Sequence, residues 1–390
     1  MSIHQFTGGA AALALPPQIA IRPPEWWEAK YSLSADLASF SKYITNDSFD
    51  HYTLGLGVVG NAAMGEATGK AAYYGRAYFY LQSLIDIAVP VAGGYKGWYS
   101  AYYGGAETSL NEIYCWRFAP DLLLPTKNIL AYAERWAAVQ AFLEDNIWSK
   151  WYTRGINANI YRSVLHIASH WAKLALYLRT EGSTATIRAQ ADAICAAISH
   201  AGIPYWNGAS IYQHIRKFPH PVGGANTAFW PAYWTGTVGA GGSEPYGSDC
   251  AHGVAIGTFV SAALRAGYGP WSVDNDLPRL IRLRDIIYSP GVCWNTLAGA
   301  AGQTTWAGKL AEFGRLAQFD RAFQTFLEND EARGVAAGSE KWGTFALNAA
   351  RLGALPMSIH QFSGAGVAVP AADRLWRRLC RRPRNDADRQ

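Results

Sequence analysis

The chain has 390 residues, of which 50% are apolar, 16% charged and 14% aromatic, with 16 Trp and 22 Tyr. This apolar content excludes a disordered chain, and the lack of an apolar run of about 18 residues argues against a transmembrane helix. The net charge is +5, but seven Arg and three Asp in residues 371–390 supply +4 of it, so the remainder lacks the basic character of a nucleic-acid-binding protein.

Composition divides the chain into three expected parts. Residues 1–24 are small, apolar and proline-containing, and we expect a leader or loose arm, although Gly8–Leu15 makes a poor signal peptide without a preceding Lys or Arg. Residues 25–355 are expected to form the catalytic domain, and 356–390 a Gly/Ala-rich and then Arg-rich tail. The five cysteines are widely scattered, which argues against a disulfide framework or a cysteine zinc site.

Apolar residues recur with helical periodicity through most of the central part. The pattern predicts helices over Ser34–Ile44, Ala71–Ile87, Pro125–Trp151, Tyr161–Leu178, Thr186–His200, Ala251–Ala266, Leu277–Ile287, Trp306–Glu328 and Glu340–Leu352. Only short strands near Ile203–Tyr212 are expected, so the fold class is all-α, built from packed helical hairpins. The connections 91–112 and 203–250 are long for a compact domain, which favours a functional role for them.

A first cluster of polar residues lies in the predicted helix Tyr161–Leu178. Arg162, His166 and His170 recur every four residues and therefore share one helix face, which Lys173 and Tyr177 extend. Such a stripe suits the lining of a cleft, and a solvated surface face is the alternative. The His-x3-His spacing also fits a metal pair, but the glutamate of the HExxH motif is missing.

Two further clusters carry imidazole, phenol and cationic groups. His252 follows Tyr246 and Asp249 in the first turn of a predicted helix, where the helix dipole favours the neutral imidazole that can accept a proton. Tyr212, His214 and Arg216 share one face if that segment is extended, with Lys217 beside them. A helix cap with a packed His, and an ordinary basic loop, are the alternatives.

The fourth cluster joins aromatic residues to Asn111. Trp98, Tyr99, Tyr102 and Tyr103 precede the segment Asn111–Arg117, and such rings can stack on sugars, although each one alone more often packs in a core. Trp234 is a further candidate of the same kind. The glycines at 55, 57 and 60 match a GxGxxG pattern without the flanking strand and acidic residue that a dinucleotide site requires, so nucleotide binding is not expected.

These residues resemble the helical-toroid polysaccharide lyases that act on uronic-acid polymers, the alginate- and glucuronan-lyase-like group. The resemblance covers about half of the chain and rests on Arg162, His166, the Ser-His-Trp-Ala run 169–172 and the Tyr-x-x-Asp-x-x-His-Gly stretch 246–253. It implies an (α/α) toroid, a complete or incomplete barrel of helical hairpins with long aromatic loops. Many of these lyases place an Asn directly before the helical His, whereas Leu165 stands there in this chain.

The resemblance implies cleavage of an acidic polysaccharide by β-elimination. Arg and His neutralise the uronate carboxylate, and His and Tyr act as base and acid. The expected catalytic residues are Arg162, His166, Tyr212, Tyr246 and His252. The expected substrate-binding residues are Trp98, Tyr102, Asn111, His170, His214, Arg216, Lys217 and Trp234.

Other functions remain open at this point. A glycoside hydrolase or sugar epimerase on the same toroid would depend on Glu112, Glu244 and Asp249, because hydrolysis requires two opposed carboxylates. A non-catalytic glycan-binding protein would depend on the aromatic residues alone. We expect no cofactor or metal, an acidic polysaccharide as partner, no nucleic acid and no membrane span. The substrate class suggests a periplasmic or secreted protein.

Overall fold

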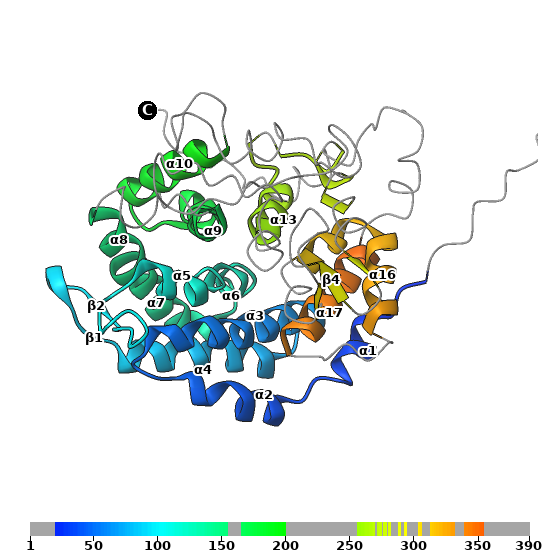
Figure 1. The fold of residues 1–390 in the computed structure, drawn as a ribbon, viewed down its shortest axis with the longest axis horizontal. Helices are drawn as coiled ribbons and strands as arrows, with labels where there is room; N and C mark the ends of the chain where they lie inside the picture. The colour runs from blue at the N-terminus through cyan, green and yellow to red at the C-terminus, as the bar shows by residue number, and fades with distance from the viewer. Residues whose placement is uncertain are drawn as a thin grey trace, which may run out of the picture. The chain divides into compact units, whose positions relative to one another are not determined.

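The computed structural model describes residues 20–154 and 165–199, and then 256–354 apart from 270, 275, 279, 282–287, 290–291, 295–302, 306–312 and 332–338. The chain divides into two compact units, Met1–Leu352 and Gly353–Gln390. The described part is mostly helical with a few short strands, which confirms the expected all-α class (Figure 1). None of its helices combines the length and apolar character that crossing a bilayer requires.

The first part of the structure holds six α-helices and one small hairpin. The α-helices are α1 (Pro24–Glu28), α2 (Leu33–Phe40), α3 (His51–Thr68), α4 (Ala71–Ile87), α5 (Ser109–Trp116) and α6 (Ala119–Thr126). The 3-10 turns η1 (Ser41–Tyr43), η2 (Ser48–Asp50) and η3 (Ala92–Gly94) lie between them, and β1 (Val89–Pro90) pairs antiparallel with β2 (Lys96–Gly97). Helix α4 has the bounds that periodicity predicted.

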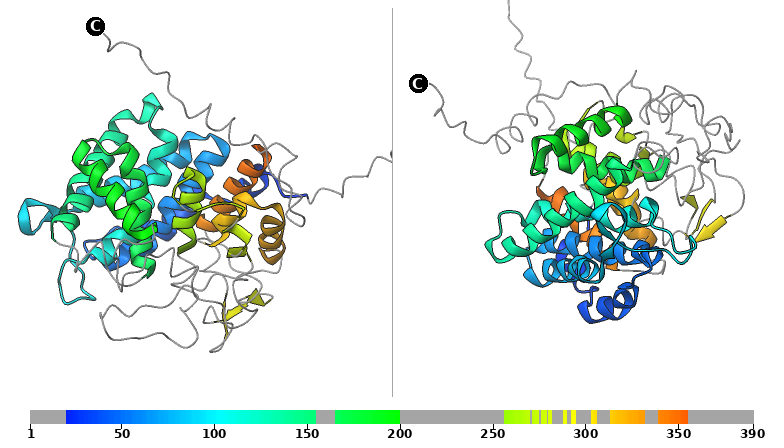
Figure 2. Two further views of the ribbon diagram at one scale, coloured as in Figure 1. Left: turned by 90° about the horizontal axis from the view of Figure 1, so that it is seen from above. Right: turned by 90° about the vertical axis from the view of Figure 1, so that its left-hand side faces the viewer.

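The second part continues with helices of more varied type. They are η4 (Leu130–Tyr132), α7 (Ala133–Phe142), the π-helical segment η5 (Leu143–Ser149), α8 (Lys150–Thr153), α9 (Leu165–Glu181), α10 (Ala185–Ser199), α13 (Ile256–Ala266), η6 (Arg315–Phe319), α16 (Arg321–Glu331) and α17 (Ser339–Ala354). An antiparallel sheet of β3 (Tyr288–Ser289), β4 (Val292–Trp294) and β5 (Gln303–Thr305) was not predicted. Helices α9 and α10 lie side by side in Figure 1 and in both views of Figure 2.

Two predicted helices are interrupted. The expected helix from Pro125 to Trp151 is wrong at its start, because Pro125 lies in the last turn of α6 and the next α-helix begins only at Ala133. The expected helix over Trp306–Glu328 is broken in its described part at Asp320, whose backbone is extended. The Asp320 carboxylate accepts a hydrogen bond of 2.7 Å from the Phe323 amide and so caps a new helix, α16.

Helix α3 is the central helix that periodicity missed. It contains the glycines at 55, 57, 60 and 65, each of which costs about 1 kcal/mol relative to Ala in a helix. Two thirds of its residues are buried, and it contacts α4, α5 and α6. Its glycines permit this close packing: a Cβ on Gly55 would lie 2.9 Å from the Tyr114 carbonyl oxygen and 3.2 Å from the Phe118 ring.

A buried carboxylate fixes α3 to the two helices beside it in the chain. Asp36 of α2 accepts hydrogen bonds from Asn61 of α3 at 2.9 Å and from the Tyr80 hydroxyl of α4 at 2.5 Å. The Tyr31 hydroxyl donates a third at 3.1 Å. Because all of these groups are buried, losing one partner would leave a polar group unsatisfied, which makes the arrangement of the three helices specific.

Replacing Gly55 by Ala should lower the free energy of unfolding by about 1–3 kcal/mol, because the new methyl group meets the α5 backbone. The control is Gly75→Ala in α4, where a Cβ has no atom within 4 Å. That substitution should raise the free energy of unfolding by about 0.5–1 kcal/mol through helix propensity. Urea unfolding followed by circular dichroism measures both, and equal effects would contradict the close approach of α3 and α5.

Candidate functional site

The structure describes the side chains of four of the predicted site residues. These are Trp98, Tyr102, Asn111 and His170. His166 lies in α9, but only its backbone is described. Arg162, Tyr212, His214, Arg216, Lys217, Trp234, Tyr246 and His252 lie outside the described residues.

Trp98 is a core residue, contrary to the prediction that it stacks on a sugar. Its indole N–H donates to the Leu84 carbonyl oxygen at 3.2 Å, and no part of the side chain is exposed. Trp116 stacks on its ring, and the His51 imidazole meets it edge-on at a centroid distance of 4.8 Å. Burial of Trp98 therefore holds the loop after β2 against α4, and the ring has no face for a ligand.

Asn111 is also buried, and its amide connects two segments of the backbone. Its Nδ2 donates to Ser48 Oγ at 3.3 Å and to Ser100 Oγ at 3.0 Å. Ser48 belongs to η2 and Ser100 to the loop before α5. As placed here, both donors of the Asn111 amide are directed at these two serines, and its predicted role in substrate binding stays a prediction.

His170 is fully buried on α9, whose two faces are both covered. Every residue from Ile167 to Leu178 is buried, so the stripe that includes His170, Lys173 and Tyr177 faces protein, not the open cleft that was predicted. The Arg117 guanidinium donates from Nη1 to His170 Nε2 at 2.8 Å. Because a guanidinium has no lone pair to offer, Nε2 must be the acceptor, and the imidazole is neutral with its proton on Nδ1.

Next to His170, three cationic side chains gather around the Phe118 ring, and two of them share one carboxylate. Asp121 of α6 accepts a hydrogen bond from Lys173 of α9 and another, at 2.8 Å, from Nη1 of Arg315 in η6. The Phe118 ring lies within 6 Å of all three cations, at 4.4 Å from Arg117, 4.8 Å from Lys173 and 5.6 Å from Arg315. We call the group of Arg117, Lys173, Arg315, Asp121 and His170 the cationic centre.

The ionisation of these groups follows from their neighbours. Burial raises the pKa of Asp121, but Arg315 and Lys173 outweigh it and hold the pKa below its usual range. Burial lowers the pKa of Lys173 to about 8, and Arg315 and Arg117 act in the same direction while Asp121 opposes them. Cations crowded in this way favour an additional anion.

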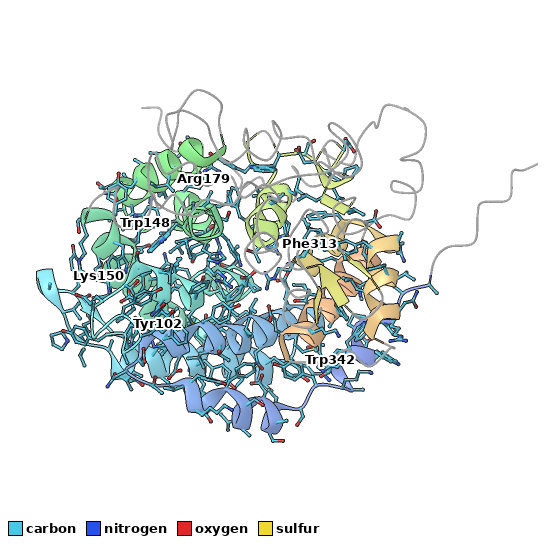
Figure 3. All side chains as sticks on the ribbon, in the orientation of Figure 1. Tyr102, Trp148, Lys150, Arg179, Phe313 and Trp342 are labelled. Atoms are coloured by element: carbon cyan, nitrogen blue, oxygen red, sulfur yellow. The ribbon has the colours of Figure 1, made fainter. Side chains whose placement is uncertain are left out.

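On the surface lies a group of aromatic rings, which we call the aromatic platform. It consists of Phe49, Tyr52, Tyr99, Tyr102 and Tyr103, all exposed, with Tyr102 at 70% (labelled in Figure 3). The Phe49 and Tyr102 rings stack at a centroid distance of 4.8 Å, and Tyr103 meets Tyr102 edge-on. Tyr102 was singled out from the sequence and its exposure suits the predicted contact with a sugar, which stays a prediction.

Tyr114 of α5 connects the aromatic platform to the cationic centre. The platform residue Tyr52 meets the half-buried Tyr114 ring edge-on at 4.7 Å. Behind that ring lie His170, at a centroid distance of 5.4 Å, and the Arg117 guanidinium, at 5.1 Å. The sequence indicated Tyr114 and Arg117 only as neighbours of Asn111. It gave no signal for Phe49 and Tyr52, because their significance depends on ring contacts with Tyr102 and Tyr114 in other segments.

Glu112, the acid that a hydrolase would use, is fully buried. Its carboxylate accepts from Lys150 Nζ at 2.8 Å (labelled in Figure 3) and from the Trp151 indole N–H at 2.6 Å. Burial raises the pKa of Glu112, against the effect of Lys150. Glu244 and Asp249, the other carboxylates considered for hydrolysis, lie outside the described residues.

No family model, curated protein or solved structure matches this chain. Within the described ranges, no group of three or more His, Cys, Asp or Glu side chains is arranged to hold a metal ion.

Replacing Asp121 by Asn should lower the free energy of unfolding by about 3–5 kcal/mol, because the buried Lys173 and Arg315 lose the partly buried carboxylate that they share. Asp192→Asn is the matched control, since its ion pair with Arg179 is on the surface and its side chain is 58% exposed. That change should cost less than about 1 kcal/mol. Urea unfolding measures both, and a similar small loss in the two variants would contradict the buried ion-pair cluster.

His51 should make the protein sensitive to mild acid. Burial lowers the pKa of His51 to about 4, below the unfolded value of about 6.5. Between these pH values the unfolded chain binds a proton that the folded protein does not, so stability falls as pH drops, by about 3 kcal/mol from this group.

The measurement is the free energy of unfolding from urea titrations between pH 7 and pH 4. In His51→Phe the curve should be flatter by that amount, because the titrating group is gone. Parallel curves for the two proteins would show that His51 titrates normally in the folded state.

Proposed function

We propose that this protein is a polysaccharide lyase that cleaves an acidic, uronic-acid-containing polysaccharide by β-elimination, and that the helices of its first unit form an (α/α) toroid. The observation that carries the proposal is the series of ring contacts from Tyr52, an exposed residue of the aromatic platform, through Tyr114 to Arg117 and His170. Exposed rings suit the faces of sugars, and gathered cations suit carboxylates.

The reaction requires charge stabilisation at the C6 carboxylate and two proton transfers, one from the adjacent C5 and one to the oxygen that leaves C4. A base removes the proton on C5, the C4–O bond breaks, the departing oxygen takes a proton from an acid, and a C4=C5 double bond forms. Cations beside the C6 carboxylate stabilise the negative charge that develops as the C5 proton leaves. The cationic centre contributes this field from within the protein.

Tyr114 is the residue of this group that we assign to proton transfer. It is half-buried, stands between the platform and the cationic centre, and has the Arg117 guanidinium next to its ring. A phenol can act as an acid or as a base when its environment supports either form. His170 accepts the hydrogen bond from Arg117 and so acts as a positioning residue.

The residues predicted from the sequence complete this proposal. Arg162 and Arg216 would add positive charge, and His166, Tyr212, Tyr246 and His252 would supply further acids and bases. A hydrolase or epimerase is less well supported, because Glu112 is held by Lys150 and Trp151 in the interior. A glycan-binding protein without catalysis is the second candidate, and the exposure of the aromatic platform favours it.

The test is incubation of the full chain with alginate, glucuronan and other uronic-acid polysaccharides, following the ultraviolet absorbance of the unsaturated uronate. Absorbance should rise with at least one polymer. Tyr114→Phe should lower kcat about 100-fold or more, because the transferable proton is lost. The control is Tyr43→Phe, another half-buried tyrosine beside a cation, with Lys42 at 5.2 Å, and its kcat should be unchanged.

Each other outcome contradicts a definite part of the proposal. New reducing ends without absorbance would indicate a hydrolase. Binding without any product would indicate the glycan-binding protein. A rise in absorbance that Tyr114→Phe leaves unchanged would keep the lyase and remove Tyr114 from the mechanism.

A further inference from the structure

We infer that the aromatic platform is a subsite for an uncharged sugar. A second step rests on the proposed lyase function. If the platform binds an uncharged sugar, the substrate of the lyase is a heteropolysaccharide in which neutral sugars lie next to the uronate that is cleaved.

Two carboxylates lie on the same short segment as Phe49. Asp47 Oδ1 accepts from the Phe49 amide at 3.0 Å and from the Ala101 amide at 3.3 Å. Asp50 Oδ2 accepts from the Thr45 hydroxyl at 2.7 Å. Within the described part of the chain neither carboxylate takes part in an ion pair, and their negative charge would repel a uronate carboxylate bound over these rings.

The same groups suit a neutral pyranose. A pyranose ring presents C–H groups on its face, which pack on the negative face of an aromatic ring, and hydroxyl groups at its edge. A carboxylate can only accept hydrogen bonds, so it is a good partner for those hydroxyls. Exposed rings beside charged acceptors therefore match an uncharged, hydroxyl-rich ligand.

The platform is also held in position before any ligand binds. The Ser48 amide donates to the Tyr99 carbonyl oxygen at 2.8 Å, which joins η2 to the loop that carries Tyr102 and Tyr103. The Asn111 amide holds the serines at 48 and 100, and the loop closes through a bond of 3.0 Å from the Ser100 amide to Ala106. Preformed rings lose little conformational entropy on binding, which favours a specific subsite.

Charge then sets the order of sugars along the polymer. The aromatic platform, at the surface, has the carboxylates of Asp47 and Asp50 beside Phe49. On the inner side of Tyr114 lie Arg117 and the rest of the cationic centre. A uronate is favoured on the inner side and disfavoured at the platform. In a polymer of uronates alone, the sugar over the aromatic platform would also carry a carboxylate, which Asp47 and Asp50 would repel.

The experiment is calorimetric binding of two probes to the full chain, a neutral β-1,4-linked glucohexaose and a hexauronate prepared from alginate. Tyr102→Ala should weaken binding of the neutral probe about tenfold, because the most exposed ring of the platform is lost. The matched control is Phe79→Ala on α4, another exposed aromatic residue, which should leave binding unchanged. Asp50→Asn keeps an acceptor for Thr45 and should strengthen hexauronate binding several-fold at low salt.

The outcomes separate this inference from the lyase proposal. Failure of the neutral probe to bind, or equal losses in Tyr102→Ala and Phe79→Ala, would overturn the subsite. Hexauronate binding that depends on Tyr102 and ignores Asp50→Asn would overturn its neutral character. If the neutral probe binds as expected but no polymer gives an unsaturated product, including polymers in which neutral sugars alternate with uronates, the subsite stands and the heteropolysaccharide lyase falls.

Discussion

The close approach of α3 and α5 at Gly55 determines where the candidate site forms. Without a side chain at that position, α3 comes close to the backbone of Tyr114 and to the Phe118 ring. One turn earlier on α3, Tyr52 then reaches the Tyr114 ring. A single contact between two helix backbones thus sets both the link from the surface and the position of the ring that the three cations surround.

The cationic centre depends on the same packing in a second way. Arg117, Lys173 and Arg315 come from three different elements, and they meet only because α5, α6, α9 and η6 pack around Phe118. Removing charged groups from water is costly, so such a cluster adds little to stability by itself. It does make the arrangement specific, since Asp121 must be present for Lys173 and Arg315 to be accommodated.

The aromatic platform and the cationic centre offer different chemical groups to a ligand. The platform gathers rings with carboxylates at the surface, and the centre gathers cations in the interior. Tyr114 contacts both, because its ring meets Tyr52 of the platform and also lies against Arg117 and His170 of the centre. In the function that we propose, one part selects the neighbouring sugar and the other stabilises charge at the reacting one.

Local signals in the sequence were sufficient where neighbours along the chain decide the structure. The all-α class and the bounds of α4 follow from periodicity, and the wealth of Tyr, Trp and cationic groups is visible from composition. Helix α3 was missed because its glycines oppose helix formation locally, and the packing that stabilises it comes from distant residues. The break after Pro125 was likewise misjudged, because proline favours the first turn of a helix, whereas Pro125 lies in the last turn of α6.

The sequence by itself determined the kinds of groups that this protein can use, and the tertiary structure decided which of them share a surface. Trp98 and Tyr102 are four residues apart in one aromatic loop, yet Trp98 is buried against His51 and Trp116 while Tyr102 is exposed. His170 and Lys173 lie on a stripe that looks polar along α9, yet Arg117 and Asp121 cover it from other helices. The physical reason is that burial and charge pairing are set by contacts between segments far apart in the chain, which spacing along one helix or loop does not encode.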